Sequence, residues 1–370
     1  MIDALDECGD DKSRPALLKV LTDAAAQAHW LRIIIISRPE VDIQRFFDTP
    51  DNRTSHVRCD LAADTEASSD LRAFTQDQFG WVASRRHLQS PWPEQSLFDG
   101  VISRAAGLFI FIKTIALALE HSRDPTATLR ATLEDSAGTG LASLYGLYSN
   151  ILRERIVYSA DEFRRMVGVL LTTAPHRPLC EETIARLAEV ERSLVKTWVD
   201  NLSSLLYRDE GANGGIRVRH LSISDFFVDD HCDYRVNLED AHAQLGFACL
   251  ETMVEQLRFN ICRLEDSRVA NADVQDLQSR IEKNISHALQ YSSLYWSTHL
   301  CFTHHNVNRD QRVLGRLKEF FEEPYPLFWT EVLSVMGMVP IGAPSLRRVI
   351  SWVKVSACHG SASQDDSDSL

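Results

Sequence analysis

The sequence predicts a short α/β segment followed by a mainly α-helical chain that contains one small β-hairpin. Three observations lead to this fold class. The run Leu31–Ile36 is aliphatic and β-branched and is too short for a helix, so it fits a buried parallel strand. From about residue 66 onward, apolar residues recur at helical spacing. A Gly/Asn-rich stretch at residues 209–215 separates two short strand-like runs, which indicates a hairpin.

Residues 1–65 form the predicted α/β segment. Ile2 ends one strand, and the following helix starts at Ser13, a good N-cap residue, with Pro15 in its first turn. Leu31–Ile36 is the second strand, and residues 56–61 are a candidate third. A strand, a helix and a second strand of this length predict a βαβ crossover.

Residues 66–158 are predicted to form a helical domain. Its apolar residues repeat with a helical period over three stretches, which are Asp70–Phe79, Gln95–His121 and Leu144–Tyr158. The most apolar run, Ala105–Leu119, is interrupted by Lys113 and is shorter than the roughly 20 residues that a membrane span needs. We therefore expect a buried helix there and no membrane span.

Residues 159–235 follow the element order of a winged helix. Three helices are expected at Asp161–Thr173, Glu181–Ala188 and Ser193–Leu205, followed by strands at Leu206–Arg208 and Ile216–Arg219. The third helix, which reads DNA in many winged helices, carries one Lys and one Asp and is otherwise largely apolar. We expect it to serve packing and switching, with no nucleic acid as a partner.

Residues 236–358 are predicted to be a C-terminal helical domain, and residues 359–370, rich in Ser and Asp, a disordered tail. The amphipathic stretches of the helical domain are Leu238–Phe259, Val274–Phe302, Arg309–Phe321 and Leu346–Val355.

The composition excludes some classes of function. The chain has 370 residues, 44% of them hydrophobic, and a formal net charge of −13, which argues against a surface that neutralises nucleic-acid phosphates. Eight cysteines are scattered without a C-x-x-C pair, which is typical of reduced thiols in a cytoplasmic protein.

An acidic cluster and an arginine follow the two predicted strands. Asp3, Asp6 and Glu7 come after the first strand, and Arg38 ends the second. Ligands of open α/β sheets bind at the carboxyl ends of strands, where a carboxylate can hold Mg²⁺ and an Arg can reach a phosphate. The pattern therefore predicts a site for a metal-bound phosphate. The alternatives are an acidic loop that caps a strand and a surface Arg that ends one.

His220 follows the second strand of the hairpin, in the run Val218–Phe227. A lone His after an apolar strand is more often a structural residue than a ligand contact, and its spacing alone does not decide between the two.

Taken together, these segments resemble NACHT-type STAND NTPases, a family of P-loop NTPases. Ile2-Asp3-Ala4-Leu5-Asp6-Glu7-Cys8 resembles the Walker B segment, and Ile33–Glu40 is similar to sensor 1. Ala105-Ala106-Gly107-Leu108-Phe109-Ile110 resembles the helical segment after the NTPase core of fungal NACHT proteins. His220-Leu221-Ser222-Ile223-Ser224-Asp225-Phe226 is similar to the winged-helix H-x-S-x-x-[DE]-F motif. The order and spacing match over about residues 1–230.

The resemblance implies a role for each matching residue. Asp3 would hold Mg²⁺, Asp6 and Glu7 would be the catalytic acidic pair, and Arg38 would sense the γ-phosphate. Gly107 and Phe109 would lie near the nucleotide, although related NTPases often have Pro at the position of Phe109. His220 would contact the β-phosphate of ADP and lock a closed state, so ATP/ADP and Mg²⁺ are the implied cofactors.

Two functions follow as expectations. In the first, the chain is a fragment of a NACHT signalling NTPase, truncated at its N-terminus, whose parent uses ATP and ADP to gate homotypic oligomerisation. The sequence contains no G-x-x-x-x-G-K-[ST] loop, so we expect the chain itself not to hydrolyse ATP. In the second, it is a non-enzymatic helical interaction module that packs with NACHT partners. A metal-dependent hydrolase unrelated to NTPases is a distant third.

Overall fold

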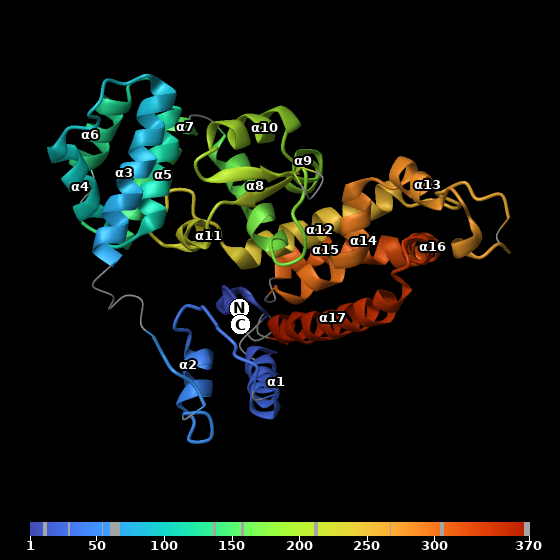
Figure 1. The fold of residues 1–370 in the computed structure, drawn as a ribbon. Coiled ribbons are helices and arrows are strands. Elements are labelled where there is room, and N and C mark those ends of the chain that lie inside the picture. Colours follow the sequence, from blue (N-terminus) through green and yellow to red (C-terminus); the bar gives the residue numbers. More distant parts are fainter. Residues whose placement is uncertain are drawn as a thin grey trace. The chain divides into compact units, whose positions relative to one another are not determined.

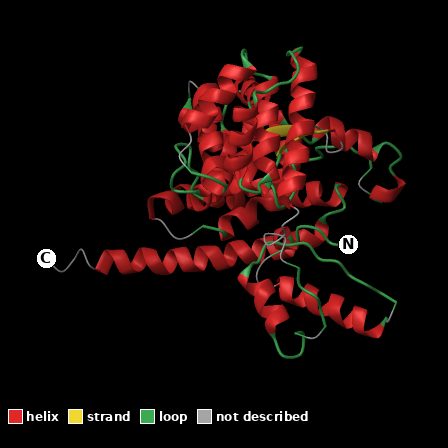
Figure 2. Cartoon of the chain, turned by 60° about the vertical axis from the view of Figure 1, so that its left-hand side comes forward, coloured by secondary structure: helices red, strands yellow, loops and turns green. Residues whose placement is uncertain are grey.

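The computed structural model describes residues 1–9, 13–28, 30–53, 55–59, 67–135, 138–156, 159–210, 214–266, 268–303 and 307–365. These divide into two compact units, Met1–Ala67 and Ser68–Leu370. Helices make up nearly all of the regular structure in both units (Figures 1 and 2). The mainly helical fold predicted from the sequence is therefore present.

The first unit is small. It contains a 3-10 helix, η1 (Leu5–Glu7), and two α-helices, α1 (Ser13–Gln27) and α2 (Val41–Asp48). Leu5, Leu18 and Ile43 form its buried core. Ile2 and Ile35 pack against this core and make one parallel bridge. Two parallel segments joined by a bridge are all that the described residues contain of the predicted sheet.

The prediction that Leu31–Ile36 is buried on both faces is wrong. Ile35 faces the core of the first unit, but its neighbours Ile34 and Ile36 are 61% and 39% exposed. Successive side chains of an extended segment point to opposite sides, and the core covers only one side here. The predicted strand at residues 56–61 is absent over 56–59, and its last two residues lie outside the described part.

The second unit is built from helices α3 to α17 and one hairpin. Its α-helices and strands, in chain order, are α3 (Ala67–Arg86), α4 (Gln95–Ala105), α5 (Phe109–Glu120), α6 (Pro125–Asp135), α7 (Leu141–Arg155), α8 (Ala160–Thr173), α9 (Glu181–Ala188), α10 (Arg192–Asn201), β1 (Leu206–Asp209), β2 (Gly215–Val218), α11 (Leu221–Val228), α12 (Leu238–Gln256), α13 (Leu277–Asn284), α14 (His287–Cys301), α15 (Val307–Glu322), α16 (Tyr325–Val335) and α17 (Gly342–Asp365).

One hydrophobic core runs through the second unit, from Leu71 in α3 to Trp352 in α17. The predicted domain limits at residues 158 and 235 fall inside it. Helix α17 continues to Asp365, into the range predicted to be a disordered tail, and residues 366–370 lie outside the described part. No helix among the described residues is long and apolar enough to cross a bilayer.

Helices α12 and α14 form the most extensive helix pair of the second unit (Figure 1). The side chain of Asn237 accepts the backbone N–H groups of Glu239 and Asp240 and so caps the start of α12. Ser286 caps α14 in the same way. At Gly246 the helices approach so closely that an added Cβ would lie 2.8 Å from Leu300 Cδ2. Glycine at this position permits the close packing.

Helices α8, α9 and α10 precede the antiparallel hairpin β1–β2, which pairs Leu206 with Val218. Arg208 on β1 joins the hairpin to the helices, since its guanidinium donates to Glu181 at the start of α9 and to Asp200 at the end of α10. The hydrogen bond from Arg208 is the main cause of the lowered pKa of Asp200. This order of three helices and a hairpin is the one expected for residues 159–235.

Candidate functional site

The two segments that carry the predicted acidic cluster and the predicted phosphate-sensing arginine lie side by side in the first unit. Ile2 N–H donates to the carbonyl of Ile34 at 2.8 Å, and Ile36 N–H donates to that of Ile2 at 2.9 Å. Leu5 N–H then donates to the carbonyl of Ile36 at 3.1 Å. Because the segments are parallel, their carboxyl ends meet at one edge.

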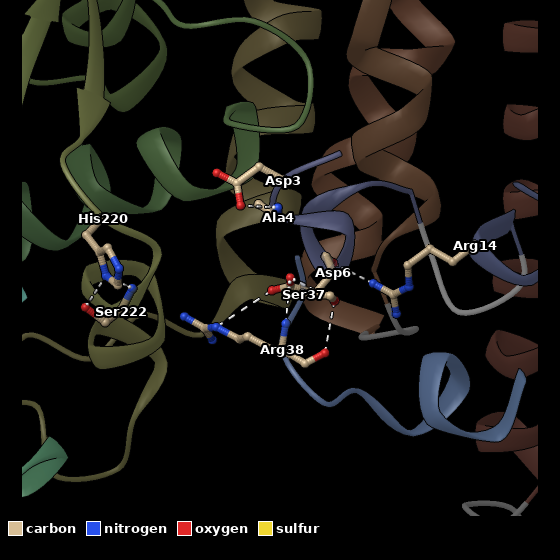
Figure 3. A network of polar contacts seen from close by, with 8 residues as sticks. All are labelled: Asp3, Ala4, Asp6, Arg14, Ser37, Arg38, His220 and Ser222. Carbon is tan, nitrogen blue, oxygen red and sulfur yellow. Dashed lines mark hydrogen bonds and ion pairs between the residues drawn. The ribbon is translucent and has the colours of Figure 1, made fainter. Parts of the chain in front are cut away.

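Asp6 joins the two segments at that edge. Its Oδ1 accepts the backbone N–H of Arg38 at 3.0 Å and the hydroxyl of Ser37 at 3.2 Å (Figure 3). Its Oδ2 lies 3.7 Å from Nε of Arg38, an ion pair. The side chain of Asp6 is only 7% exposed, while that of Arg38 is 41% exposed. The site thus pairs the predicted catalytic carboxylate with the predicted sensor.

Arg14 supports the turn that carries Asp6. Its Nη1 donates to the backbone carbonyl of Asp6 at 2.6 Å, and its Nε donates to Asp42 Oδ2 at 2.8 Å. The hydrogen bond from Arg14 is the main cause that lowers the pKa of Asp42. The guanidinium of Arg14 therefore links α1 and α2 to the turn at Asp6.

Asp3 and Glu7, the other predicted site carboxylates, are exposed. Asp3 Oδ1 accepts the N–H of Ala4 at 3.0 Å, and Ala4 adopts φ 52°, in the left-handed region. This turn redirects the chain directly after Asp3. No group of three or more His, Cys, Asp or Glu residues in the described part is arranged to hold a metal ion.

Gly107 and Phe109 lie in the second unit, at the connection from α4 to α5. Ala106 and Gly107 have φ values of 44° and 91°, and Gly107 would have open space around an added Cβ. Phe109 is the first residue of α5 and is 39% exposed. Its ring lies 5.3 Å from that of Phe74 in α3, so part of its surface is covered within the unit.

His220, also in the second unit, caps helix α11. Its Nδ1 accepts the backbone N–H of Ser222 at 3.1 Å and lies 2.7 Å from Ser222 Oγ (Figure 3). Ser222 Oγ in turn lies 2.9 Å from the hydroxyl of Tyr148, whose pKa is raised by burial. Because Nδ1 is an acceptor, the proton of the neutral imidazole is on Nε2.

The structure thus brings Asp6 and Arg38 into contact, with Asp3 and Glu7 on the same short turn. Sequence reasoning missed Arg14, Ser37, Ser222 and Tyr148. Ser37 was within the recognised motif and carried a signal, whereas Arg14 and Tyr148 come from helices whose contacts no local pattern specifies. No family model, curated protein or solved structure matches the chain.

Proposed function

We propose that this chain carries the Walker B and sensor 1 segments, the helical domain and the winged helix of a NACHT-type nucleotide-gated switch. The contact between Asp6 and Arg38 carries the proposal. It joins two sequence motifs 32 residues apart at the carboxyl edge of two parallel segments, where phosphate ligands of α/β sheets bind. The order of α8–α10 and the hairpin supports the winged-helix assignment.

The proposal gives different roles to the acidic residues. Asp6 already accepts two hydrogen bonds and faces Arg38, so it acts as a positioning group that holds the arginine at the edge. Glu7 is exposed and is the residue proposed to orient water, and Asp3 is the proposed Mg²⁺ ligand. Arg38, whose side chain is 41% exposed, is the residue proposed to reach a terminal phosphate.

The described residues do not by themselves fit a magnesium–nucleotide complex. Mg²⁺ is usually held by one or two carboxylates together with substrate phosphates, and the phosphates need a backbone cradle and a lysine. Asp3 offers one exposed carboxylate, and the printed sequence has no G-x-x-x-x-G-K-[ST] cradle. We derive no hydrolytic step from these residues and expect no ATP turnover by them alone.

His220 is proposed to contact the β-phosphate of ADP. Its Nδ1 is engaged by Ser222, which leaves the proton on Nε2, the atom that a phosphate oxygen requires as donor. In a parent chain that holds the nucleotide, the cap on α11 would couple the nucleotide to the winged helix, so that exchange of ADP for ATP would change the packing of that domain and permit homotypic oligomerisation. The seven cysteines whose side chains are described are free, which supports a cytoplasmic location.

Release of phosphate from Mg²⁺·ATP tests the expectation that these residues do not hydrolyse ATP. The chain and its Glu7→Gln and Glu40→Gln variants should all give the background rate, Glu40 being another exposed carboxylate of the first unit. Turnover that Glu7→Gln abolishes and Glu40→Gln preserves would show that these residues hydrolyse ATP without the cradle.

The sequence of the transcript tests the proposed assignment to the NACHT family. Sequencing its 5′ end should reveal an in-frame G-x-x-x-x-G-K-[ST] upstream of Met1, and the protein encoded by that longer frame should form larger assemblies with ATP than with ADP. A stop codon in frame directly upstream of Met1, or assembly that ignores the nucleotide, contradicts the switch.

The second candidate function is a helical interaction module. Its support is the continuous core of the second unit, which buries residues from α3 to α17. Such a module would associate with a NACHT protein that has an intact phosphate loop. Absence of complex formation with such proteins in size-exclusion chromatography counts against it.

A further inference from the structure

A cavity of about 520 Å³ lies among α8, α9, α12 and α15 in the second unit. Helix α12 contacts each of the other three helices, and Figure 1 shows them grouped around it. The volume falls within the range of about 300–1,000 Å³ that is typical of small-molecule sites. None of the residues assigned above to nucleotide binding lines it.

Most of the cavity wall is apolar. Helix α8 contributes Val169, the end of α9 contributes Leu187, and α12 contributes Phe247. Three alanines, at 188, 241 and 243, also line the cavity, and their small side chains leave space that larger residues would fill. An apolar body of a ligand would therefore displace water from this wall, which is favourable at about 25 cal/mol per Å² of buried apolar surface.

Two arginines also line the cavity. Arg165 is fixed in place, since its Nε donates to the carbonyl of Ala188 at 3.0 Å and its Nη2 to that of Glu189 at 3.2 Å. The guanidinium of Arg312 lies 4.7 Å from the ring centre of Phe247, and it makes no ion pair with any residue in the described ranges. Among the described lining residues Glu189 is the one acidic side chain, so two positive charges and one negative charge leave that part of the lining with a net charge of +1.

We propose that this cavity binds an amphipathic organic anion with an apolar body and one carboxylate. The alanine-rich wall accepts the apolar body, and the net positive charge selects the carboxylate. Guanidinium groups bind carboxylates by charge-assisted hydrogen bonds, which are stronger than neutral ones. Arg312 supplies the cation because its donors are not committed within the described part, whereas Arg165 already donates to two carbonyls of the chain.

Isothermal titration calorimetry with decanoate tests the proposal. Decanoate should bind saturably at one site, and 1-decanol, which has the same chain and no charge, should bind about tenfold more weakly, in line with the value of a charged hydrogen bond. Arg312→Gln should weaken decanoate binding by a similar factor and leave 1-decanol unchanged. Arg347→Gln, at an exposed arginine of α17, is the matched control and should have no effect.

A second pair of variants tests the location. Gln244 is an exposed lining residue, so Gln244→Trp should fill the cavity and abolish binding without disturbing the core. Gln278→Trp, at an exposed position of α13, should bind decanoate normally. Equal binding of decanoate and 1-decanol, or decanoate binding that survives both Arg312→Gln and Gln244→Trp, overturns the proposal. So does the absence of any decanoate binding.

Discussion

Lowering the pH from 7.5 to 5 should weaken the second unit, because one buried and one half-buried histidine join α12 to α14. Nδ1 of His242 in α12 lies 2.9 Å from Nδ1 of His299 in α14, and the hydroxyl of Tyr291 lies 2.7 Å from Nε2 of His299. The ring of His176, in the loop after α8, lies 5.7 Å from that of His299. His299 is fully buried, and no acidic residue hydrogen-bonds to either imidazole in the described part.

The surroundings disfavour a charged imidazole. Burial, with further contributions from His242 and His176, lowers the pKa of His299 to about 3. Burial and the neighbouring His176 lower the pKa of His242 to about 4, and burial also lowers the pKa of His176. His299 and His242 are therefore neutral in the folded protein at pH 5.

The sign of the pH effect follows from the unfolded state. There a histidine binds a proton below about pH 6.5, whereas folded His299 binds it only near pH 3. The unfolded state thus binds more protons between these values, so the stability present above pH 6.5 is lost as the pH falls toward 3. For His299, 1.5 pH units below 6.5 at about 1.4 kcal/mol each give a loss of about 2 kcal/mol at pH 5. The lowered pKa of His242 adds a loss in the same direction.

The measurement compares variants, since carboxylates also titrate in this range. Urea unfolding of the second unit, followed by circular dichroism at pH 7.5 and 5, gives the loss for each protein. In His299→Gln the loss should be about 2 kcal/mol smaller than in the wild type. Tyr291→Phe removes the hydrogen bond but keeps both imidazoles. It should lower stability by about 1 kcal/mol at both pH values and leave the pH dependence unchanged.

Two results would refute this reasoning. One is an equal loss of stability in the wild type and His299→Gln. The other is a His299 resonance that titrates near pH 6.5 in the folded protein, which histidine-labelled NMR spectra resolve directly.

Two further predictions concern packing and the site. Gly246→Ala should lower the melting temperature, since the new Cβ would lie 2.8 Å from Leu300 Cδ2 and overpacking costs about 1–3 kcal/mol. The control is Gly80→Ala in α3, where the new Cβ would meet no atom within 4 Å. This substitution should raise the stability by about 0.5–1 kcal/mol. A gain of stability in both variants would show that α12 and α14 do not approach closely. Asp6→Ala should speed hydrogen exchange of the Arg38 amide, which donates to Asp6. Asp3→Ala should not change this rate, because Asp3 accepts from Ala4 instead. Equal protection of the Arg38 amide in both variants would mean that Asp6 does not hold the sensor segment.

The elements that could be predicted from sequence are those specified by local patterns. Helix α9 was predicted with its observed bounds, and the hairpin was predicted within a residue or so at each strand end. In both cases apolar spacing and turn residues are contained in the element itself. Helix α2 was missed because it is short, and helices α6 and α16 were missed because their apolar residues are only weakly segregated to one face. The prediction that Leu31–Ile36 is buried on both faces was wrong, because the burial of this run depends on which other segments cover it.

The candidate site was predictable as a set of residue types and not as a set of contacts. The motif placed acidic residues and an arginine after two apolar runs, and the parallel arrangement of those runs makes their ends meet. It did not predict that Asp6 would accept the backbone N–H of Arg38. That bond depends on the register of two distant segments, which a one-residue slip would change.

The sequence by itself determined the mainly helical class, the order of three helices and a hairpin, and the position of the acidic and arginine motifs. These follow from the period of apolar residues and the conformational preferences of Gly, Pro and Asn, which act over a few residues. Only the tertiary structure decided the partners of Asp6, the imidazole pair between α12 and α14, and the cavity with Arg165 and Arg312. Each joins side chains from elements far apart in the chain, and burial and distance between such elements arise only when the whole core packs.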